Sequence, residues 1–307
     1  MRMDAAPDSN PLLCTVVVLF QPDPNVEENV RALIRECGRV VVADNGCPTD
    51  LRARLETVSG VTWLSMDGNV GVATALNRGL AWARAQGFVW ALTFDQDSQP
   101  EPGMVRALWQ AAQTMPQAVV ICPRVQEEGS EPANYRWVTK HPALPFLFQR
   151  VACTGRDLPA VTMAVTSGSL FDLTAWEELG RFDDRFFIDY IDTEYCLRVI
   201  RAGRTVAVAG NAVLRHRLGA RQERVLLGRD FRPMNHAPFR HYYMARNRIA
   251  AWRRHAFAVP HWAMFDFCFA WYNLARVLLF EAQRWAKVKA IMRGTWHGLC
   301  GKSGPMS

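Results

Sequence analysis

Two carboxylates separated by a single residue, Asp95 and Asp97, follow an apolar run of the chain, Phe88–Phe94. A short apolar run bounded by polar residues is typical of a buried strand in a parallel sheet. Ligands bind beyond the carboxyl ends of such strands, and carboxylate oxygens suit a hard divalent cation held against phosphate oxygens. The pattern therefore predicts a Mg²⁺ or Mn²⁺ ion and a phosphate ester at this edge of a sheet, although the same triplet also occurs in ordinary surface turns.

A second group of acids lies in the segment Phe187–Arg198. Asp189 and Asp192 are three residues apart, so they share a helix face if both are helical. Asp192 is the candidate general base, a group that must lie within hydrogen-bonding reach of the proton it removes. The alternative is that these acids only complement the positive end of the helix dipole.

Three further positions suit a nucleotide or a metal ion. Asp44 ends a predicted strand and can accept a hydrogen bond from the imide N–H of uracil or thymine, or form an Asx-turn. Gly68–Gly71 precedes a predicted helix, where glycine backbone and the helix N-terminus favour phosphate, but an ordinary turn capped by Asn69 fits equally. His216 ends a predicted short strand and could share a metal ion with Asp97, although a lone histidine is more often structural.

These residues need a sheet to bring them together, and the first part of the chain predicts one. The predicted strands are Leu13–Phe20, Arg39–Asp44, Thr62–Met66, Phe88–Asp95 and Ala118–Pro123. The predicted helices between them are Asn25–Glu36, Thr49–Ser59, Val70–Gln86 and Gly103–Met115. Alternating strands and helices predict an α/β fold, with a doubly wound, mainly parallel, Rossmann-like sheet covered on both faces.

The later segments are less regular. Four prolines in residues 127–159 predict loops and edge strands, and two helices are expected after them, one from Asp172 and one ending near Ile200. Residues 238–298 are expected to be helical.

Composition limits the class of protein. The chain has 307 residues, 50% of them hydrophobic and 21% charged, which is typical of a globular protein. Its eight cysteines include no C-x-x-C pair, which favours a reducing compartment over a disulfide framework or a zinc site. No cleavage site follows the apolar stretch Leu12–Phe20, so we expect a strand there and not a secretory signal.

The charge is concentrated late in the chain. Residues 215–254 contain eleven arginines and two acids, whereas the whole chain has a net charge of +7. No nucleic-acid recognition motif accompanies the arginines, so we expect no nucleic-acid partner; an anionic membrane surface fits better.

An aromatic tail follows the basic segment. Residues 242–296 hold thirteen of the 33 aromatic residues. In Trp262–Lys287 a narrow polar stripe lies opposite a broad apolar face, and its charges argue against a spanning helix. The apolar face is expected either to lie at a membrane interface or to pack on the catalytic domain or on another subunit, as in a homo-oligomer.

Seven segments together resemble family 2 glycosyltransferases in order and spacing. They are Gln21–Asp23, Ala43–Gly46, Asn69–Gly71, Asp95–Ser98, Ser167–Ser169, Phe187–Arg198 and Arg240–Tyr243. The likeness is strongest to bacterial rhamnosyltransferases of polysaccharide (O-antigen-type) assembly, and it covers residues 13–300.

The resemblance implies a GT-A fold and an inverting transfer of a sugar, L-rhamnose from dTDP-L-rhamnose in the nearest relatives, to an acceptor hydroxyl. In the matching positions, Asp192 looks like the base, Asp97 and His216 like metal ligands, and Asp44 and Asp95 like contacts to the nucleobase and ribose. The other expected nucleotide-sugar contacts are Gln21, Asn69, Gly71 and Ser98. The residues expected on the acceptor side are Asp189, Ser169 and Arg198.

The expected organisation is a catalytic domain in residues 1–237, with a nucleotide-sugar half (about 12–125) and an acceptor half (about 126–237), followed by a helical, aromatic-rich extension in residues 238–307. We expect a cytoplasmic protein, peripheral to the inner membrane, that acts on a glycan or lipid-linked glycan. The alternatives are a transferase for a UDP- or GDP-linked sugar and a non-catalytic scaffold. A nucleotidyltransferase needs a Gly-rich, Lys-containing loop after the first strand, which Leu19–Pro24 does not provide.

Overall fold

The computed structural model describes residues 12–23, 25–127, 135–216, 224–226, 229–231 and 235–306. At its centre is a nine-stranded mixed sheet with the order β3-β2-β1-β4-β10-β6-β11-β5, and β9 also pairs with β11. The strands of this sheet are β1 (Leu13–Leu19), β2 (Val40–Asp44), β3 (Val61–Ser65), β4 (Trp90–Asp95), β5 (Ser98–Pro100), β6 (Ala118–Glu127), β9 (Leu158–Val161), β10 (Ser169–Asp172) and β11 (Thr205–His216). Strands β1 to β4 pair in parallel, as does β6 with β11, so the predicted doubly wound α/β sheet is confirmed.

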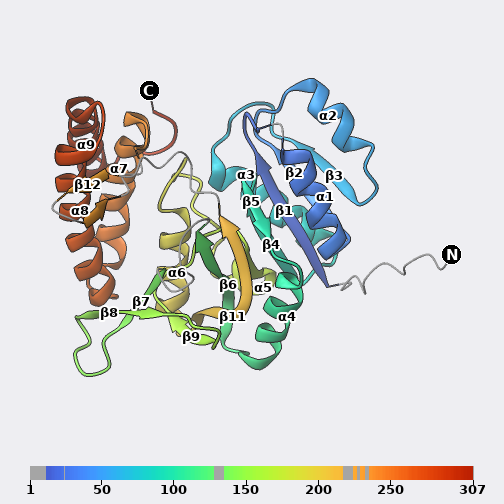
Figure 1. Cartoon of the computed structure of the whole chain (residues 1–307), viewed down its shortest axis with the longest axis horizontal. Helices are drawn as coiled ribbons and strands as arrows, with labels where there is room; N and C mark the ends of the chain where they lie inside the picture. The colour runs from blue at the N-terminus through green and yellow to red at the C-terminus, as the bar shows by residue number, and fades with distance from the viewer. Residues whose placement is uncertain are drawn as a thin grey trace.

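Helices cover both faces of the sheet (Figure 1). Those of the sheet region are α1 (Val26–Cys37), α2 (Thr49–Glu56), α3 (Val72–Ala85), α4 (Met104–Thr114), α5 (Leu173–Glu178) and α6 (Ile191–Arg201). Apolar residues of α3, α5 and α6 form one core cluster, and those of α1, α2 and α4 form another on the opposite face. Both faces of a parallel sheet are therefore buried, which explains why every residue of β1 is inaccessible.

Local sequence determines where several elements begin and end. Gly38 ends α1 in the left-handed conformation (φ 73°) and its N–H donates to the carbonyl of Ile34. Asp172 begins α5 by accepting hydrogen bonds from the N–H groups of Thr174 and Ala175 at 2.8 and 3.0 Å. Both helix ends lie close to their predicted positions.

The structure also differs from the sequence prediction. β10 runs antiparallel between β4 and β6, and β5 pairs antiparallel with β11; neither strand was predicted. β11 spans twelve residues, so His216 ends a long strand and not a short one. Asp189 has φ 64° and precedes α6, so it does not share a helix face with Asp192.

Two small hairpins lie outside the central sheet. They are formed by β7 (Arg136–Lys140) with β8 (Phe148–Ala152) and by β12 (Arg224–Leu226) with β13 (Arg229–Phe231). The first hairpin fits the expectation of edge strands in residues 127–159. Much of the predicted basic segment, residues 217–223, 227–228 and 232–234, lies outside the described residues.

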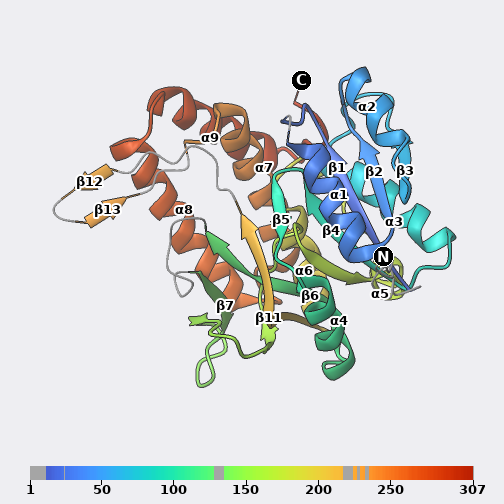
Figure 2. The ribbon, with the colours of Figure 1, turned by 45° about the vertical axis from the view of Figure 1, so that its right-hand side comes forward.

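Three helices end the chain: α7 (Pro238–His255), α8 (Pro260–Phe280) and α9 (Arg284–Leu299). Figures 1 and 2 show them together on the side of the molecule away from β2 and β3. α7 and α9 approach closely, since a Cβ on Gly294 would lie 2.2 Å from the backbone oxygen of Tyr242. The predicted boundary at residue 237 coincides with the start of α7, but the division into two domains stays a prediction.

The predicted single stripe in Trp262–Lys287 is wrong, because the chain turns between Phe280 and Arg284, with Gln283 at φ 53°. Within the described part of the chain, α8 is the one helix whose length and composition would allow it to cross a membrane. On these two criteria the argument against a spanning helix fails.

Candidate active site

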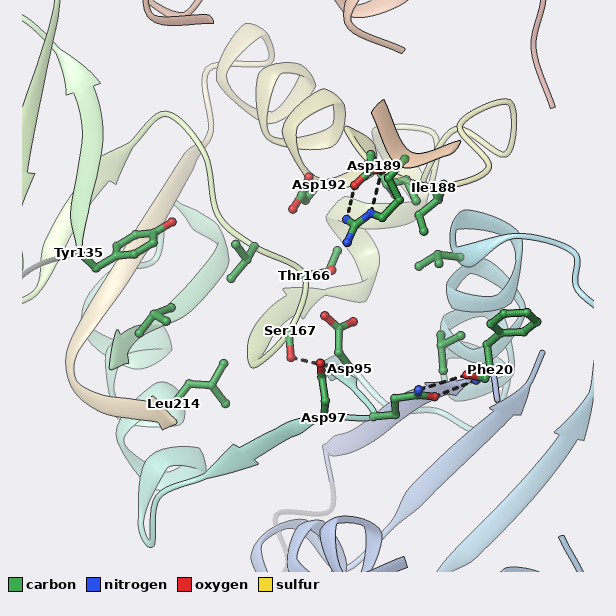
Figure 3. A pocket seen from close by; sticks show the side chains of 17 residues that line it. Phe20, Asp95, Asp97, Tyr135, Thr166, Ser167, Ile188, Asp189, Asp192 and Leu214 are labelled. Carbon is green, nitrogen blue, oxygen red and sulfur yellow. Dashed lines mark hydrogen bonds and ion pairs between the residues drawn. The ribbon is translucent and has the colours of Figure 1, made fainter. Parts of the chain in front are cut away.

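Four acids and one arginine that are far apart in the sequence line a single cleft of about 530 Å³. Asp95 ends β4 and Asp97 lies in the turn after it, Asp189 precedes α6, Asp192 lies in the first turn of α6, and Arg240 lies in the first turn of α7. Figure 3 shows the carboxylate of Asp95 directed toward the segment that carries Asp189 and Asp192. The cleft lies beyond the carboxyl end of β4, as expected for an α/β sheet.

Hydrogen bonds hold the turn that carries Asp97. The Oγ of Ser167 accepts from the N–H of Asp95 at 3.0 Å and donates to the Oγ of Ser98 at 2.8 Å. The side chain of Gln96 both accepts from the N–H and donates to the carbonyl of Phe20, at 2.9 and 3.1 Å. Ser98 is buried by these contacts, so its side chain supports the turn and does not line the cleft.

The carboxylates of the cleft repel one another. Desolvation, followed by the negative charges of Asp97 and Asp192, raises the pKa of Asp95 to about 7, even though Asp95 is exposed toward the cleft. A group of like charges at a cleft favours a bound cation, which lowers the electrostatic cost of keeping the acids ionised.

Asp192 has the properties expected of a general base. Its carboxylate lines the cleft and accepts a hydrogen bond from the N–H of Thr193 at 2.7 Å. Desolvation raises its pKa to about 6, the nearby charge of Asp189 acts in the same direction, and the Thr193 hydrogen bond opposes both. A carboxyl group with this pKa is ionised at neutral pH and basic enough to take a proton from an activated hydroxyl.

Arg240 pairs with Asp189. Its Nε donates to Asp189 Oδ2 at 3.3 Å, and a second guanidinium nitrogen contacts Oδ1. Asp95 and Asp192 are also close enough to raise the pKa of Arg240. Among the described residues that line the cleft, Arg240 is the one cation.

The candidate metal ligands meet at neighbouring strands. The backbone of His216 pairs with that of Ser98, the residue after Asp97, but the side chain of His216 lies outside what the structure describes. Among the described side chains, no three His, Cys, Asp or Glu residues form a metal-binding group. The exposed carboxylates of Asp95 and Asp97 supply oxygen donors that fit Mg²⁺ or Mn²⁺, with phosphate oxygens completing the shell.

The remaining predicted nucleotide contacts lie at the ends of the neighbouring strands. Asp44 Oδ1 accepts from the N–H groups of Gly46 and Cys47 at 3.0 and 2.8 Å, which is the Asx-turn alternative. Asn69 Oδ1 accepts from the side chain of Asn45 at 3.1 Å and from the N–H of Gly71 at 3.1 Å. Gln21, at φ 42°, follows β1 and donates its N–H to the carbonyl of Gly46 at 3.0 Å. Their contacts with a nucleotide stay predictions.

Gly71 approaches protein and not an open space. A Cβ at this position would lie 2.7 Å from the ring of Phe187, and the N–H of Val72 donates to the carbonyl of Phe187 at 2.8 Å. The first N–H of α3 is therefore already bonded, so this glycine joins α3 to the segment before Asp189.

Two residues expected on the acceptor side are buried or engaged elsewhere. Ser169 is fully buried and its Oγ donates to the carbonyl of Val165 at 2.5 Å. Arg198 binds both oxygens of Glu194 and the carbonyls of Leu179 and Arg181. Neither side chain lines the cleft.

The sequence predicted no role for Arg240, which lines the cleft, or for Tyr190, which lies between Asp189 and Asp192. Arg240 lies in a segment that carried the family resemblance, two residues after the proline that begins a helix, and this was the available signal. Tyr190 lies in another of these segments, Phe187–Arg198, which was the comparable signal.

The sheet, its two helical layers and the acids at its edge define a glycosyltransferase with a GT-A fold. The profile described as "Glycosyl transferase family 2" matches residues 14–180, more than half of the chain. The chain belongs to this family.

Two curated relatives cover most of the chain. It is 25% identical over 250 residues to the dTDP-rhamnosyl transferase RfbF of Shigella flexneri, covering 80% of this chain and 81% of the relative. It is 26% identical over 277 residues to an N-acetylglucosaminyl-diphospho-decaprenol L-rhamnosyltransferase of Mycobacterium tuberculosis (strain ATCC 25618 / H37Rv), covering 79% and 87%. The resemblance to rhamnosyltransferases is thus confirmed at modest identity.

Solved structures agree on the fold. S. aureus TarS 1–349 superposes with a TM-score of 0.59 at 10% identity, covering 93% of this chain and 80% of that one. GalNAc-T7, solved with UDP, GalNAc and Mn²⁺, superposes with a TM-score of 0.56 at 14% identity, covering 78% of this chain and 48% of that one. The chain therefore spans about half the length of GalNAc-T7.

Proposed function

We propose that the protein transfers L-rhamnose from dTDP-L-rhamnose to a hydroxyl group of a lipid-linked glycan during cell-surface polysaccharide synthesis, with inversion at the anomeric carbon. The observation that carries this proposal is the common cleft of Asp97 and Asp192, one suited to a cation and the other to a proton. The names of the two curated relatives support the sugar, and the name of the mycobacterial relative supports a diphospho-lipid acceptor.

In the proposed reaction, Asp192 accepts the proton of the acceptor hydroxyl as its oxygen attacks the anomeric carbon. Attack comes from the side opposite the dTDP group, and that group departs as a diphosphate that needs no proton. A single protein base is therefore sufficient, and Asp192, whose pKa is raised, fits that role. Asp97 is exposed and is left to bind the cation.

When bound, a divalent cation at Asp97 and His216 supplies charge neutralisation for the departing diphosphate. Arg240 supplies a second positive charge in the same cleft. Binding dTDP-rhamnose brings phosphate charge near the guanidinium, so we expect Arg240 to share its contacts between Asp189 and the donor.

A thermal-shift experiment with a panel of nucleotide sugars tests the donor. We expect dTDP-L-rhamnose with Mn²⁺ to stabilise the protein, by about 3 kcal/mol at a hundredfold excess over its dissociation constant. Asp97→Asn should lose the metal-dependent part, whereas the surface variant Asp50→Asn should keep it. Stabilisation by UDP-glucose or UDP-N-acetylglucosamine instead would assign a different donor.

The transfer itself needs a direct assay. We expect radiolabelled rhamnose to move from the donor to a lipid-extractable glycan, and the product to lose its label on mild acid treatment that cleaves lipid diphosphates. A protein that binds the donor but transfers no label to any extracted lipid acceptor would support the scaffold alternative.

A further inference from the structure

On α8 the polar residues are buried and apolar residues are exposed, which is the reverse of a usual surface helix. Its polar residues Asp266, Asn273 and Arg276 are 3%, 9% and 8% exposed, whereas Trp271 and Leu279 are 60% and 69% exposed. The exposed residues of this helix carry no charge: they are Pro260, Met264, Phe267, Cys268, Trp271, Tyr272, Ala275 and Leu279. A continuous apolar face of this kind marks an interaction surface.

Hydrogen bonds and ion pairs fix this orientation. Asp266 accepts from the hydroxyl of Tyr190 at 2.5 Å, from Nε of Arg248 at 3.0 Å and from the indole N–H of Trp252 at 2.7 Å. At the other end of the helix, Glu281 is fully buried. Its carboxylate oxygens lie 3.4 Å from Arg276 Nε and 2.8 Å from Lys287 Nζ. Turning α8 to hide its aromatic residues would break all of these contacts, so the outward apolar face belongs to the fold.

α9 lies beside α8 (Figure 1) and exposes aromatic and basic residues of its own. Trp285, Met292 and Trp296 are 70%, 68% and 65% exposed. The exposed cations of the same helix are Arg284, Lys289 and Arg293. No aspartate or glutamate occurs after Glu281, so the charged side chains that α9 exposes are all positive.

The chemistry of this combined face identifies its occupant. Tryptophan side chains lie favourably at lipid headgroups, and arginine and lysine attract anionic headgroups at the same depth. A second copy of the chain would bring two positive α9 faces together in a symmetric contact, which disfavours dimerisation through it. A spanning arrangement is disfavoured because Asp266 binds Arg248 and Arg276 pairs with the buried Glu281, and Asn273 between them is buried as well.

We propose that the outer faces of α8 and α9 bind the interfacial layer of an anionic lipid bilayer, with α8 lying along the membrane surface. The apolar residues of α8 enter the boundary between headgroups and acyl chains, and the cations of α9 contact phosphate groups. This surface does not depend on which sugar the cleft transfers. Membrane binding explains why α8 has a buried polar side and an exposed apolar side.

Sedimentation of the full-length protein with liposomes tests the surface. We expect binding to vesicles of phosphatidylcholine mixed with phosphatidylglycerol, weaker binding to phosphatidylcholine alone, and a decline with added salt. Lys289→Glu with Arg293→Glu should lower the partition coefficient about tenfold or more, since each cation near the surface contributes a several-fold factor. Trp285→Ser with Trp296→Ser should lower it for both vesicle types.

Matched changes elsewhere serve as controls. Arg35→Glu with Arg106→Glu makes the same change of charge on α1 and α4. Leu12→Ser removes an exposed apolar residue just before β1. Both control variants should bind vesicles as the parent protein does. Nucleotide-dependent thermal stabilisation should persist in every variant, which separates this test from that of the transfer reaction. Vesicle binding that the α9 variants leave intact would overturn the proposal. Lipid-independent dimerisation that the tryptophan variant abolishes would overturn it too, by assigning the face to a second copy.

Discussion

The hydroxyl of Tyr190 donates a hydrogen bond to Asp266 Oδ1 at 2.5 Å, and so joins the segment between Asp189 and Asp192 to α8. Tyr190 precedes α6 in the left-handed conformation, at φ 65°, which few residues other than glycine adopt readily. The contact therefore helps to hold a strained residue next to the candidate base.

Tyr190→Phe should lower the turnover number about tenfold while leaving the Michaelis constant for the donor nearly unchanged. The variant keeps the ring but loses the bond to a buried carboxylate, which also costs about 2 kcal/mol of unfolding free energy. Tyr195→Phe is the matched control, because the buried Tyr195 hydroxyl finds no hydrogen-bond partner in the described part of the chain. Equal effects of the two substitutions would rule out a positioning role for the Tyr190 hydroxyl.

Asp192→Asn should abolish transfer, with a loss of at least about a hundredfold in turnover, because the amide cannot accept the proton of the acceptor. Binding of dTDP-rhamnose, followed by thermal shift, should change little, since Asp192 faces the acceptor and not the nucleotide in the proposed reaction. A variant that retains more than about a tenth of the rate would show that Asp192 is not the base.

The acidic limb of the rate profile should follow the Asp192 carboxyl, whose pKa is raised to about 6. Transfer needs the ionised form, so kcat/KM at saturating Mn²⁺ should fall about tenfold per pH unit below this pH. Asp189→Asn removes a negative charge that raises the pKa, and should move the limb to lower pH. Arg240→Gln removes a nearby positive charge and should move it to higher pH.

This pair of substitutions tests the assignment because the shifts have opposite signs. General damage to the cleft would lower the rate in both variants without separating their profiles. Shifts in the same direction, or a limb that persists unchanged when Asp192 is replaced, would contradict the role of Asp192.

Much of the site could be predicted because its signals are local. The runs before Asp44 and Asp95 are short and apolar, so they predict buried parallel strands, and the ends of such strands meet at one sheet edge. Asp192 was likewise marked by the helix that follows it. Each of these inferences needed only residues within a few positions.

Contacts between residues that are far apart in the sequence could not be predicted in this way. Gly71 was predicted to contact a nucleotide, and that contact stays a prediction; its missing side chain also makes room for Phe187, more than a hundred residues later. The two faces of α8 were visible in the sequence, yet periodicity does not say which face is buried. The partners of Asp266 on other elements, Tyr190 before α6 and Arg248 of α7, determine that the polar side faces inward.

The buried acid Glu194 should be a main source of stability around α6. Its side chain is 2% exposed and accepts from Arg198 Nε at 3.1 and 3.0 Å, and its Oε1 lies 3.2 Å from His255 Nε2. Glu194→Gln weakens the ion pair and leaves the arginine charge poorly compensated, so the free energy of unfolding at pH 7 should fall by about 3 kcal/mol. Glu56→Gln, which breaks the exposed pair with Arg52, is the control and should change it little.

The effect of Glu194→Gln should also depend on pH. Desolvation acts to raise the pKa of Glu194, but the hydrogen bonds to His255 and Arg198 outweigh it and hold the pKa below its usual value of 4.5. The stabilisation is therefore complete above that pH and is lost as the pH falls through the lower pKa of the folded state. In urea titrations the difference between parent and variant should shrink below about pH 4, and a difference that stays constant down to pH 3 would show that the charge of Glu194 is not the stabilising feature.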